Sequence, residues 1–115
     1  MIGACIEVHR HLGPGLLESI YEECVCTELC ALGIAFERQV RVPVMYKGIA
    51  VPCDYRVDLI VDRKLIVEIK SVVALLPVHE AQLLTYLRVT QLKAGLLINF
   101  NEATLRRGLR RMIQD

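Results

Sequence analysis

Two oppositely charged side chains interrupt an apolar run near the middle of the chain. Glu68 and Lys70 lie two residues apart in the segment KLIVEIKS, residues 64–71, and in a β-strand this spacing places both side chains on one face. A second acid, Asp58, precedes them across the short polar segment DRK, residues 62–64. Carboxylate oxygens are the donors that a hard divalent cation prefers, so these residues are candidates for a metal site.

The alternation of apolar residues predicts how the two segments pair. Odd-numbered positions are apolar from residue 49 to 61 and again at Leu65, Val67 and Ile69, so odd positions should pair with odd positions. If residues 62–64 form the loop, Asp58 lies directly across from Glu68, with Cβ atoms about 4.5–5.5 Å apart. Two carboxylates at this separation repel by roughly 3 kcal/mol at an effective dielectric constant of about 20. Lys70 would relieve part of this repulsion and a divalent cation most of it; the alternative is a solvated sheet face with an ion pair.

The surrounding sequence predicts a mixed β-sheet flanked by helices. Apolar residues at helical spacing predict helices over residues 2–12 and 16–32, separated by the breaker GPG at residues 13–15. Alternating patterns predict strands over 40–44, 49–61 and 65–70. A helix over 78–90, a strand over 94–100 and a last helix over 102–113, with Asn101 as its N-cap, complete the order ααβββαβα. We therefore expect an α/β (α+β) fold with a single domain over residues 1–115.

The second predicted helix should turn one face toward the core. The residues expected on that face are Leu17, Ile20, Cys24, Thr27 and Ala31.

Composition limits the class of protein. Apolar residues make up 54% of the 115 residues, which excludes a disordered chain, and no apolar run approaches the ~20 residues of a membrane span. The chain shows no secretory signal pattern, and its five cysteines form no CxxC pair, so we expect a cytoplasmic protein with reduced, mostly buried thiols. A net charge of +1 neither requires nor excludes a nucleic-acid partner.

The acidic residues and the lysine match a known signature. Asp58, a hairpin and then Glu68-Ile69-Lys70 resemble the D…(D/E)xK motif of the PD-(D/E)XK nuclease superfamily, and the predicted αβββαβ order resembles its core. Val57 stands where the signature has proline, a position that the superfamily keeps only loosely.

Two further motifs extend the resemblance over nearly the whole chain. Gln82 and Tyr86 lie four residues apart on a predicted helix, which resembles the QxxxY motif of the RecB-like branch. Gly15, Glu18 and Tyr21 in GLLESIY resemble the motif of the small bacterial GxxExxY family, which belongs to the same superfamily.

The resemblance implies a role for each of these side chains. Asp58 and Glu68 would bind Mg²⁺, or Mn²⁺ in its place, together with the Ile69 carbonyl, and Glu18 would bind the metal or its water. Lys70 would position the attacking water and stabilise charge on the phosphate. The alternatives are a retained but inactive site and, for Glu18, a favourable interaction with the helix dipole.

On the helix over 78–90, the resemblance implies that Gln82 and Tyr86 bind the scissile phosphate or support Lys70. The alternative is a half-buried polar stripe on a core helix.

Four arginines near the end of the chain predict a basic edge. In RRGLRR, Arg106 and Arg110, and likewise Arg107 and Arg111, stand four residues apart, so each pair would share a helix face. Contact with a nucleic-acid backbone is the functional interpretation, and a solvated helix face is the alternative.

The function expected from these features is Mg²⁺-dependent hydrolysis of DNA, and RNA is the alternative substrate. The alternative is a catalytically inactive nuclease-fold module that binds nucleic acid or a protein partner. A domain of this size has little room for a separate recognition element, so specificity would come from a homodimer or a larger complex.

Overall fold

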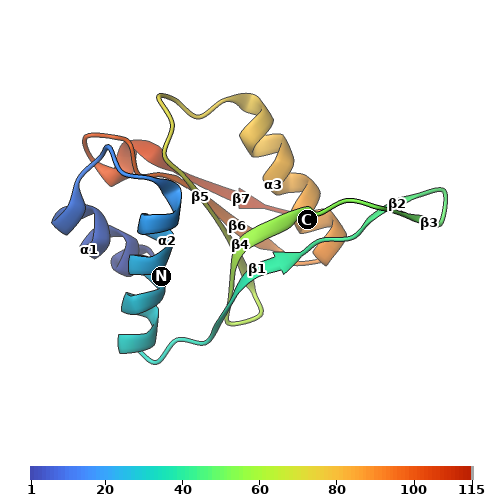
Figure 1. The fold of residues 1–115 in the computed structure, drawn as a ribbon, viewed down its shortest axis with the longest axis horizontal. Coiled ribbons are helices and arrows are strands. Elements are labelled where there is room, and N and C mark those ends of the chain that lie inside the picture. Colours follow the sequence, from blue (N-terminus) through green and yellow to red (C-terminus); the bar gives the residue numbers. More distant parts are fainter. Residues whose placement is uncertain (115) are drawn as a thin grey trace.

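A computed structural model of the protein describes residues 1–114. The helices are α1 (Ile2–Leu12), α2 (Glu18–Ala31), α3 (Pro77–Thr90) and the short 3-10 helix η1 (Leu105–Gly108). The strands are β1 (Phe36–Arg41), β2 (Val44–Tyr46), β3 (Ile49–Val51), β4 (Arg56–Val61), β5 (Leu65–Lys70), β6 (Ala94–Asn99) and β7 (Leu109–Ile113), and their arrangement is shown in Figure 1.

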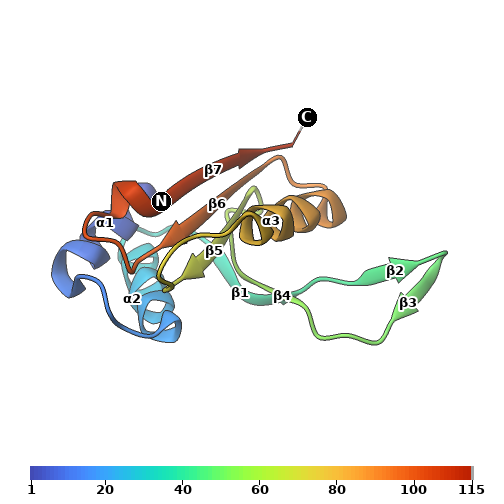
Figure 2. The ribbon, with the colours of Figure 1, turned by 90° about the horizontal axis from the view of Figure 1, so that it is seen from above.

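Five strands form the central sheet, in the order β1-β4-β5-β6-β7. Strands β5 and β6 are parallel and are joined through α3, whereas the other neighbours in this sheet are antiparallel. Strands β2 and β3 pair only with each other and form an arm that projects from the body of the molecule (Figure 2). The predicted α+β class with a mixed sheet is confirmed.

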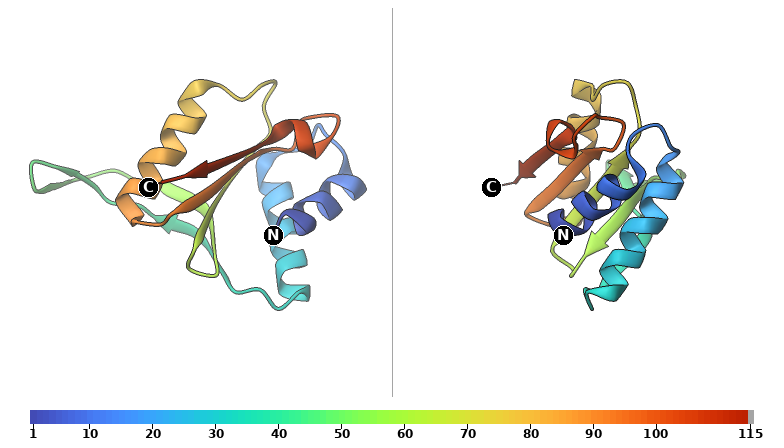
Figure 3. Two further views of the ribbon diagram at one scale, coloured as in Figure 1. Left: turned by 180° about the vertical axis from the view of Figure 1, so that it is seen from behind. Right: turned by 90° about the vertical axis from the view of Figure 1, so that its left-hand side faces the viewer.

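Helices cover both faces of the sheet, so its middle strands are buried on two sides. Helices α1 and α2 pack on one face through a cluster that includes Leu59, Val61 and Phe100. Helix α3 packs on the other face, where Leu83 and Leu87 meet Ile66. The right-hand view of Figure 3 shows the sheet between these two layers.

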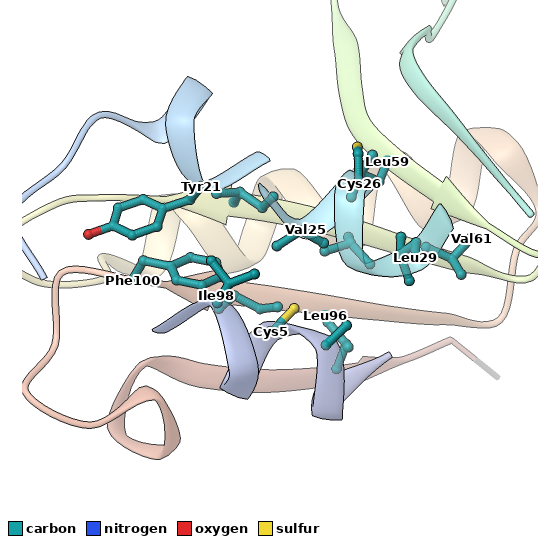
Figure 4. Close-up of a cluster of buried hydrophobic side chains, with 14 of the residues drawn as sticks. Cys5, Tyr21, Val25, Cys26, Leu29, Leu59, Val61, Leu96, Ile98 and Phe100 are labelled. Atoms are coloured by element: carbon teal, nitrogen blue, oxygen red, sulfur yellow. The ribbon is translucent and has the colours of Figure 1, made fainter. Parts of the chain in front are cut away.

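The cluster under α1 and α2 is centred on a pair of stacked aromatic rings. The rings of Tyr21 and Phe100 lie 4.5 Å apart between centroids (Figure 4), and both side chains are fully buried. The Tyr21 hydroxyl donates to the Gly13 carbonyl at 2.6 Å and accepts from the Leu16 amide at 3.1 Å. This tyrosine therefore fixes the GPG turn to the start of α2.

The predicted last helix over 102–113 is wrong. The chain forms η1 and then β7, which pairs along β6 from Ile98↔Leu109 to Ala94↔Ile113. Leu105, Leu109 and Met112 have helical spacing, but pairing with β6 satisfies the backbone groups that this strand would otherwise leave open. Asn101 is not an N-cap; its side-chain amide donates to the Val72 carbonyl at 3.2 Å.

The predicted strands over 40–44 and 49–61 are each interrupted. Strand β1 ends at Arg41 before Pro43, and β3 ends at Val51 before Pro52, which is consistent with the missing amide of proline. The predicted alternation also fails locally, because Val57 packs beneath α3 while Leu59 packs beneath α2.

The predicted core face of α2 is also wrong. Leu17 at its N-cap is 71% exposed and Ile20 in its first turn is 41% exposed. The buried residues of the helix are Tyr21, Glu22, Val25, Cys26 and Leu29. Relative to the prediction, the helix is rotated about its axis so that Tyr21 faces the core, where its ring stacks on Phe100.

Two compositional expectations can be compared with the structure. All five cysteines are free thiols, but only Cys5 and Cys26 are buried, and Cys30 is exposed. Within residues 1–114, each helix is too short or too polar to cross a lipid bilayer.

Gly108 tests the position of η1 and β7 against β6. A methyl group at this position would lie 2.2 Å from the Asn99 carbonyl oxygen, so we expect Gly108→Ala to lower the free energy of unfolding by about 1–3 kcal/mol. Gly3→Ala is the matched control, since it meets nothing within 4 Å and replaces a helical glycine with a better helix former. Urea unfolding of the two variants measures the difference; equal stability would contradict the observed packing of η1.

Candidate active site

The candidate site lies where strands β4 and β5 separate. Their pairing runs from Val61↔Leu65 to Leu59↔Val67, which confirms the predicted loop over residues 62–64. Asp58 and Glu68 are the next pair in this register, but the ladder does not continue through them. Instead, the Asp58 Oδ2 atom accepts a hydrogen bond from the Ile69 amide at 2.7 Å, so a side chain takes the place of the backbone partner.

Glu68 carries a carboxyl group into the interior. The residue is 5% exposed, and its Oε1 atom is buried with no hydrogen-bond partner among the described residues. Burial raises the pKa of Glu68 to about 9, the neighbouring Asp58 carboxylate raises it too, and the Lys70 ammonium group opposes both. The two acids and the lysine therefore interact, as the sequence predicted. The two carboxyl groups are close enough that a negative charge on Asp58 disfavours ionisation of Glu68.

The structure also brings Glu18 to the end of β5. Its Oε2 atom accepts from the Ser71 amide at 3.1 Å, and the Ser71 hydroxyl donates to the Leu16 carbonyl at 2.6 Å. Glu18 itself is exposed. The start of α2 thus fixes the residue that follows Lys70.

Gln82 and Tyr86 share one face of α3, as predicted. The Gln82 side-chain amide donates to the Tyr86 hydroxyl at 2.9 Å. Burial raises the pKa of Tyr86, and so does the charge of Glu68. Both residues also line an open groove of about 380 Å³ together with Tyr55 and Val78.

Sequence reasoning missed a buried polar residue near the end of β5. Asn99, at the end of β6, is fully buried. Its side chain accepts from the Val72 amide at 3.0 Å and donates to the Val72 carbonyl at 2.9 Å. The only sequence signal for Asn99 is a polar residue at the end of an apolar strand. Its contact with Val72 depends on β6 running parallel to β5, so that both strands end at the same edge of the sheet.

The four arginines do not form the predicted helix face. Arg106 and Arg107 belong to η1, whereas Arg110 and Arg111 are successive residues of β7, and successive strand residues point to opposite faces. The Arg110 guanidinium group donates to the carbonyls of Arg107 and Leu109. All four residues lie at the surface, but not on one helix face.

The donors present fit a divalent cation held by two carboxylates. Within residues 1–114, no group of three or more His, Cys, Asp or Glu side chains gathers at metal-binding distance. Glu68 nevertheless has a buried oxygen without a partner, next to a second carboxylate and near the end of a strand. A cation that keeps several waters or substrate oxygens needs only one or two protein carboxylates.

The raised pKa of Glu68 predicts how stability depends on pH. The pKa is about 9 in the folded protein, against an ordinary value of 4.5, so between these values the unfolded chain releases a proton that the folded chain keeps. Without divalent metal, the contribution of Glu68 to stability should therefore fall as pH rises through this window, by up to ~1.4 kcal/mol per pH unit.

Glu68→Gln keeps the shape of the side chain and removes its titration. We expect the free energy of unfolding of this variant, measured with urea from pH 5 to 8, to fall less steeply than that of the unchanged protein. Glu37→Gln, at an exposed position of β1, is the control and should leave the profile unaltered. Parallel profiles for Glu68→Gln and the unchanged protein would show that Glu68 is ionised throughout.

Comparison with known proteins identifies the family. Residues 1–112 match the family model of the PD-(D/E)XK nuclease superfamily, whereas no curated protein and no solved structure matches significantly. The match spans almost the whole chain and includes Asp58, Glu68 and Lys70. The chain therefore belongs to the PD-(D/E)XK nuclease superfamily.

Proposed function

We propose that the protein is a Mg²⁺-dependent nuclease that hydrolyses phosphodiester bonds in DNA. The observation that carries this proposal is the buried Glu68 carboxyl, whose Oε1 atom has no hydrogen-bond partner within the described part of the chain, beside Asp58 at the end of a β-ladder. A buried polar atom without a partner costs free energy, and a cation at this point would offset that cost.

Each side chain has a separate task in this proposal. Asp58 and Glu68 hold the ion, with the Ile69 carbonyl as a further ligand and Glu18 as a ligand of the ion or its water. Lys70, which ends β5 and is half-buried, donates to the attacking water and to a phosphate oxygen. Gln82 and Tyr86 orient the scissile phosphate from α3. When bound, a divalent cation polarises the phosphate and lowers the pKa of its water.

The protonation of Glu68 couples metal binding to pH. Its raised pKa means that the carboxyl holds a proton near neutral pH in the absence of a cation. Since a carboxylate must be ionised to bind a metal, binding releases this proton. Metal affinity and activity should therefore increase from pH 6 to pH 9.

The finer family assignment is part of the proposal. The motif of Gly15, Glu18 and Tyr21, together with Gln82 and Tyr86, favours the GxxExxY family within the RecB-like branch. In support, Glu18 contacts the residue after Lys70, and Gln82 and Tyr86 are directly hydrogen-bonded.

The catalytic proposal is tested by cleavage of plasmid and linear DNA with Mg²⁺ or Mn²⁺. We expect Lys70→Ala and Asp58→Ala each to lower the rate by about 10²–10³-fold, because the first removes the donor to the attacking water and phosphate and the second removes a carboxylate that holds the ion. Lys64→Ala is the matched control, since its side chain is 82% exposed in the β4–β5 loop, and it should cleave at the unchanged rate. Equal background cleavage by the unchanged protein and Lys70→Ala would rule out the catalytic proposal and leave a binding module.

Nucleic-acid binding is tested separately, without catalysis. Arginines that neutralise phosphates release counterions, so their loss weakens binding and its dependence on salt. We expect the combined Arg106→Ala, Arg107→Ala, Arg110→Ala and Arg111→Ala variant to bind a fluorescent duplex more weakly, with a shallower plot of log affinity against log salt. An Arg63→Ala variant, altered in the loop between β4 and β5, is the control. An unchanged salt slope in the fourfold variant would show that these arginines do not contact the backbone.

A further inference from the structure

The side-chain amide of Gln39 joins the candidate site to a second, buried carboxylate. Its Nε2 atom lies 2.8 Å from the Oε1 atom of Glu22 and 3.3 Å from the Oδ1 atom of Asp58. An ionised carboxylate accepts hydrogen bonds but cannot donate one, whereas the side-chain amide nitrogen of glutamine has two hydrogens to donate. The Gln39 amide is therefore chemically suited to link two acids that would otherwise repel.

Glu22 is a firm anchor for this link. The residue lies on α2, is 7% exposed, and its Oε2 atom accepts two hydrogen bonds from the Arg38 guanidinium group, at 2.9 and 3.2 Å. Arg38 also pairs with Glu23 at 2.9 Å. The Arg38 guanidinium group therefore holds the Glu22 carboxylate, and this carboxylate in turn holds the side-chain amide of Gln39.

The backbone of Gln39 departs from the strand at the same point. Gln39 has a φ angle of 50° in the middle of β1, a conformation that costs free energy for a residue other than glycine. Its neighbours pair regularly with β4, as Arg38↔Leu59 and Val40↔Val57, so the distorted residue is the one that faces Asp58. Gln39 is exposed, so burial does not account for this distortion, and the distorted residue is the one whose side chain reaches both carboxylates.

Both oxygens of Asp58 are consequently held by the protein. Oδ2 accepts from the Ile69 amide and Oδ1 from Gln39, which fixes the plane of the carboxylate while leaving lone pairs on each oxygen. We infer that Gln39, anchored by Glu22, is a positioning residue that orients the Asp58 carboxylate for metal binding. This inference rests on the proposed metal-dependent function.

Metal affinity is the direct test, with calorimetry or electron paramagnetic resonance of Mn²⁺ as the readout. Gln39→Met has a similar length and no donor, and we expect its Kd for Mn²⁺ to rise about tenfold or more, as for other residues that orient metal ligands. Glu23→Gln is the control, because it removes an exposed acid of the same network and leaves the Gln39 link intact; its Kd should be unchanged.

A double-mutant cycle separates positioning from a general structural effect. If Gln39 acts through Asp58, Gln39→Met should not weaken Mn²⁺ binding further in an Asp58→Asn background. A structural role would lower affinity in both backgrounds by the same factor, and that result would overturn the inference.

Gln39→Asn covers the case in which the methionine variant does not fold. Asparagine tolerates positive φ angles better than most residues, but its side chain is one methylene shorter and cannot span the two carboxylates. We expect this variant to fold and to bind Mn²⁺ more weakly than the unchanged protein. An unchanged Kd in a folded Gln39 variant overturns this inference alone, whereas no Mn²⁺ binding by the unchanged protein overturns the proposed function as well.

Discussion

The placement of the Glu68 carboxyl group in the interior constrains much of the structure. An ionised carboxylate that leaves water without a partner is costly, and here a second acid, Asp58, lies beside it. Burial and the Asp58 carboxylate raise the pKa of Glu68, which favours its protonated form. The β4–β5 ladder ends here, and Asp58 accepts a hydrogen bond from the Ile69 amide. A sheet optimised only for stability would place an apolar residue at position 68, in line with Ile66 on the same face.

The elements around this pair fix the end of β5 from two directions. Near the start of α2, Leu16 and Glu18 accept hydrogen bonds from Ser71. At the end of β6, the Asn99 side chain is hydrogen-bonded to both the backbone amide and the backbone carbonyl of Val72. Lys70 is the last residue before this doubly held segment. Its backbone position is therefore set by contacts distant in sequence, which is the kind of support that a precisely placed charged group requires.

The sequence pattern predicted the parts of the site that depend on residues close together in the sequence. The register of the β4–β5 hairpin followed from the alternation together with a loop over residues 62–64, and the contact between Gln82 and Tyr86 followed from helical spacing. The predicted last helix was wrong because Leu105, Leu109 and Met112 have helical spacing, while long-range pairing with β6 decided the structure. Tertiary contacts often override local propensity in this way.

Asn99 and Gln39 could not be predicted for a related reason. Neither belongs to a recognisable spacing pattern, and each acts on a segment far away in the chain. The hydrogen bonds of Asn99 require β6 beside β5, and those of Gln39 require a left-handed backbone in a strand. The sequence carries no direct signal for either condition.

Side chains of helix α2 contact both sides of the opening between β4 and β5. Glu18 and Glu22 stand one helical turn apart, and a helix holds such residues on one face at a nearly fixed separation. Glu18 contacts the segment after β5, whereas Glu22 reaches Asp58 on β4 through Gln39. Between them, Tyr21 ties the helix to the preceding turn and to Phe100 in the core. Because one rigid element contacts both sides of the opening, a shift of α2 would move the surroundings of Asp58 and Lys70 together. Tyr21 therefore sets the position of α2, and Glu18 and Glu22 on this helix contact the two sides of the opening.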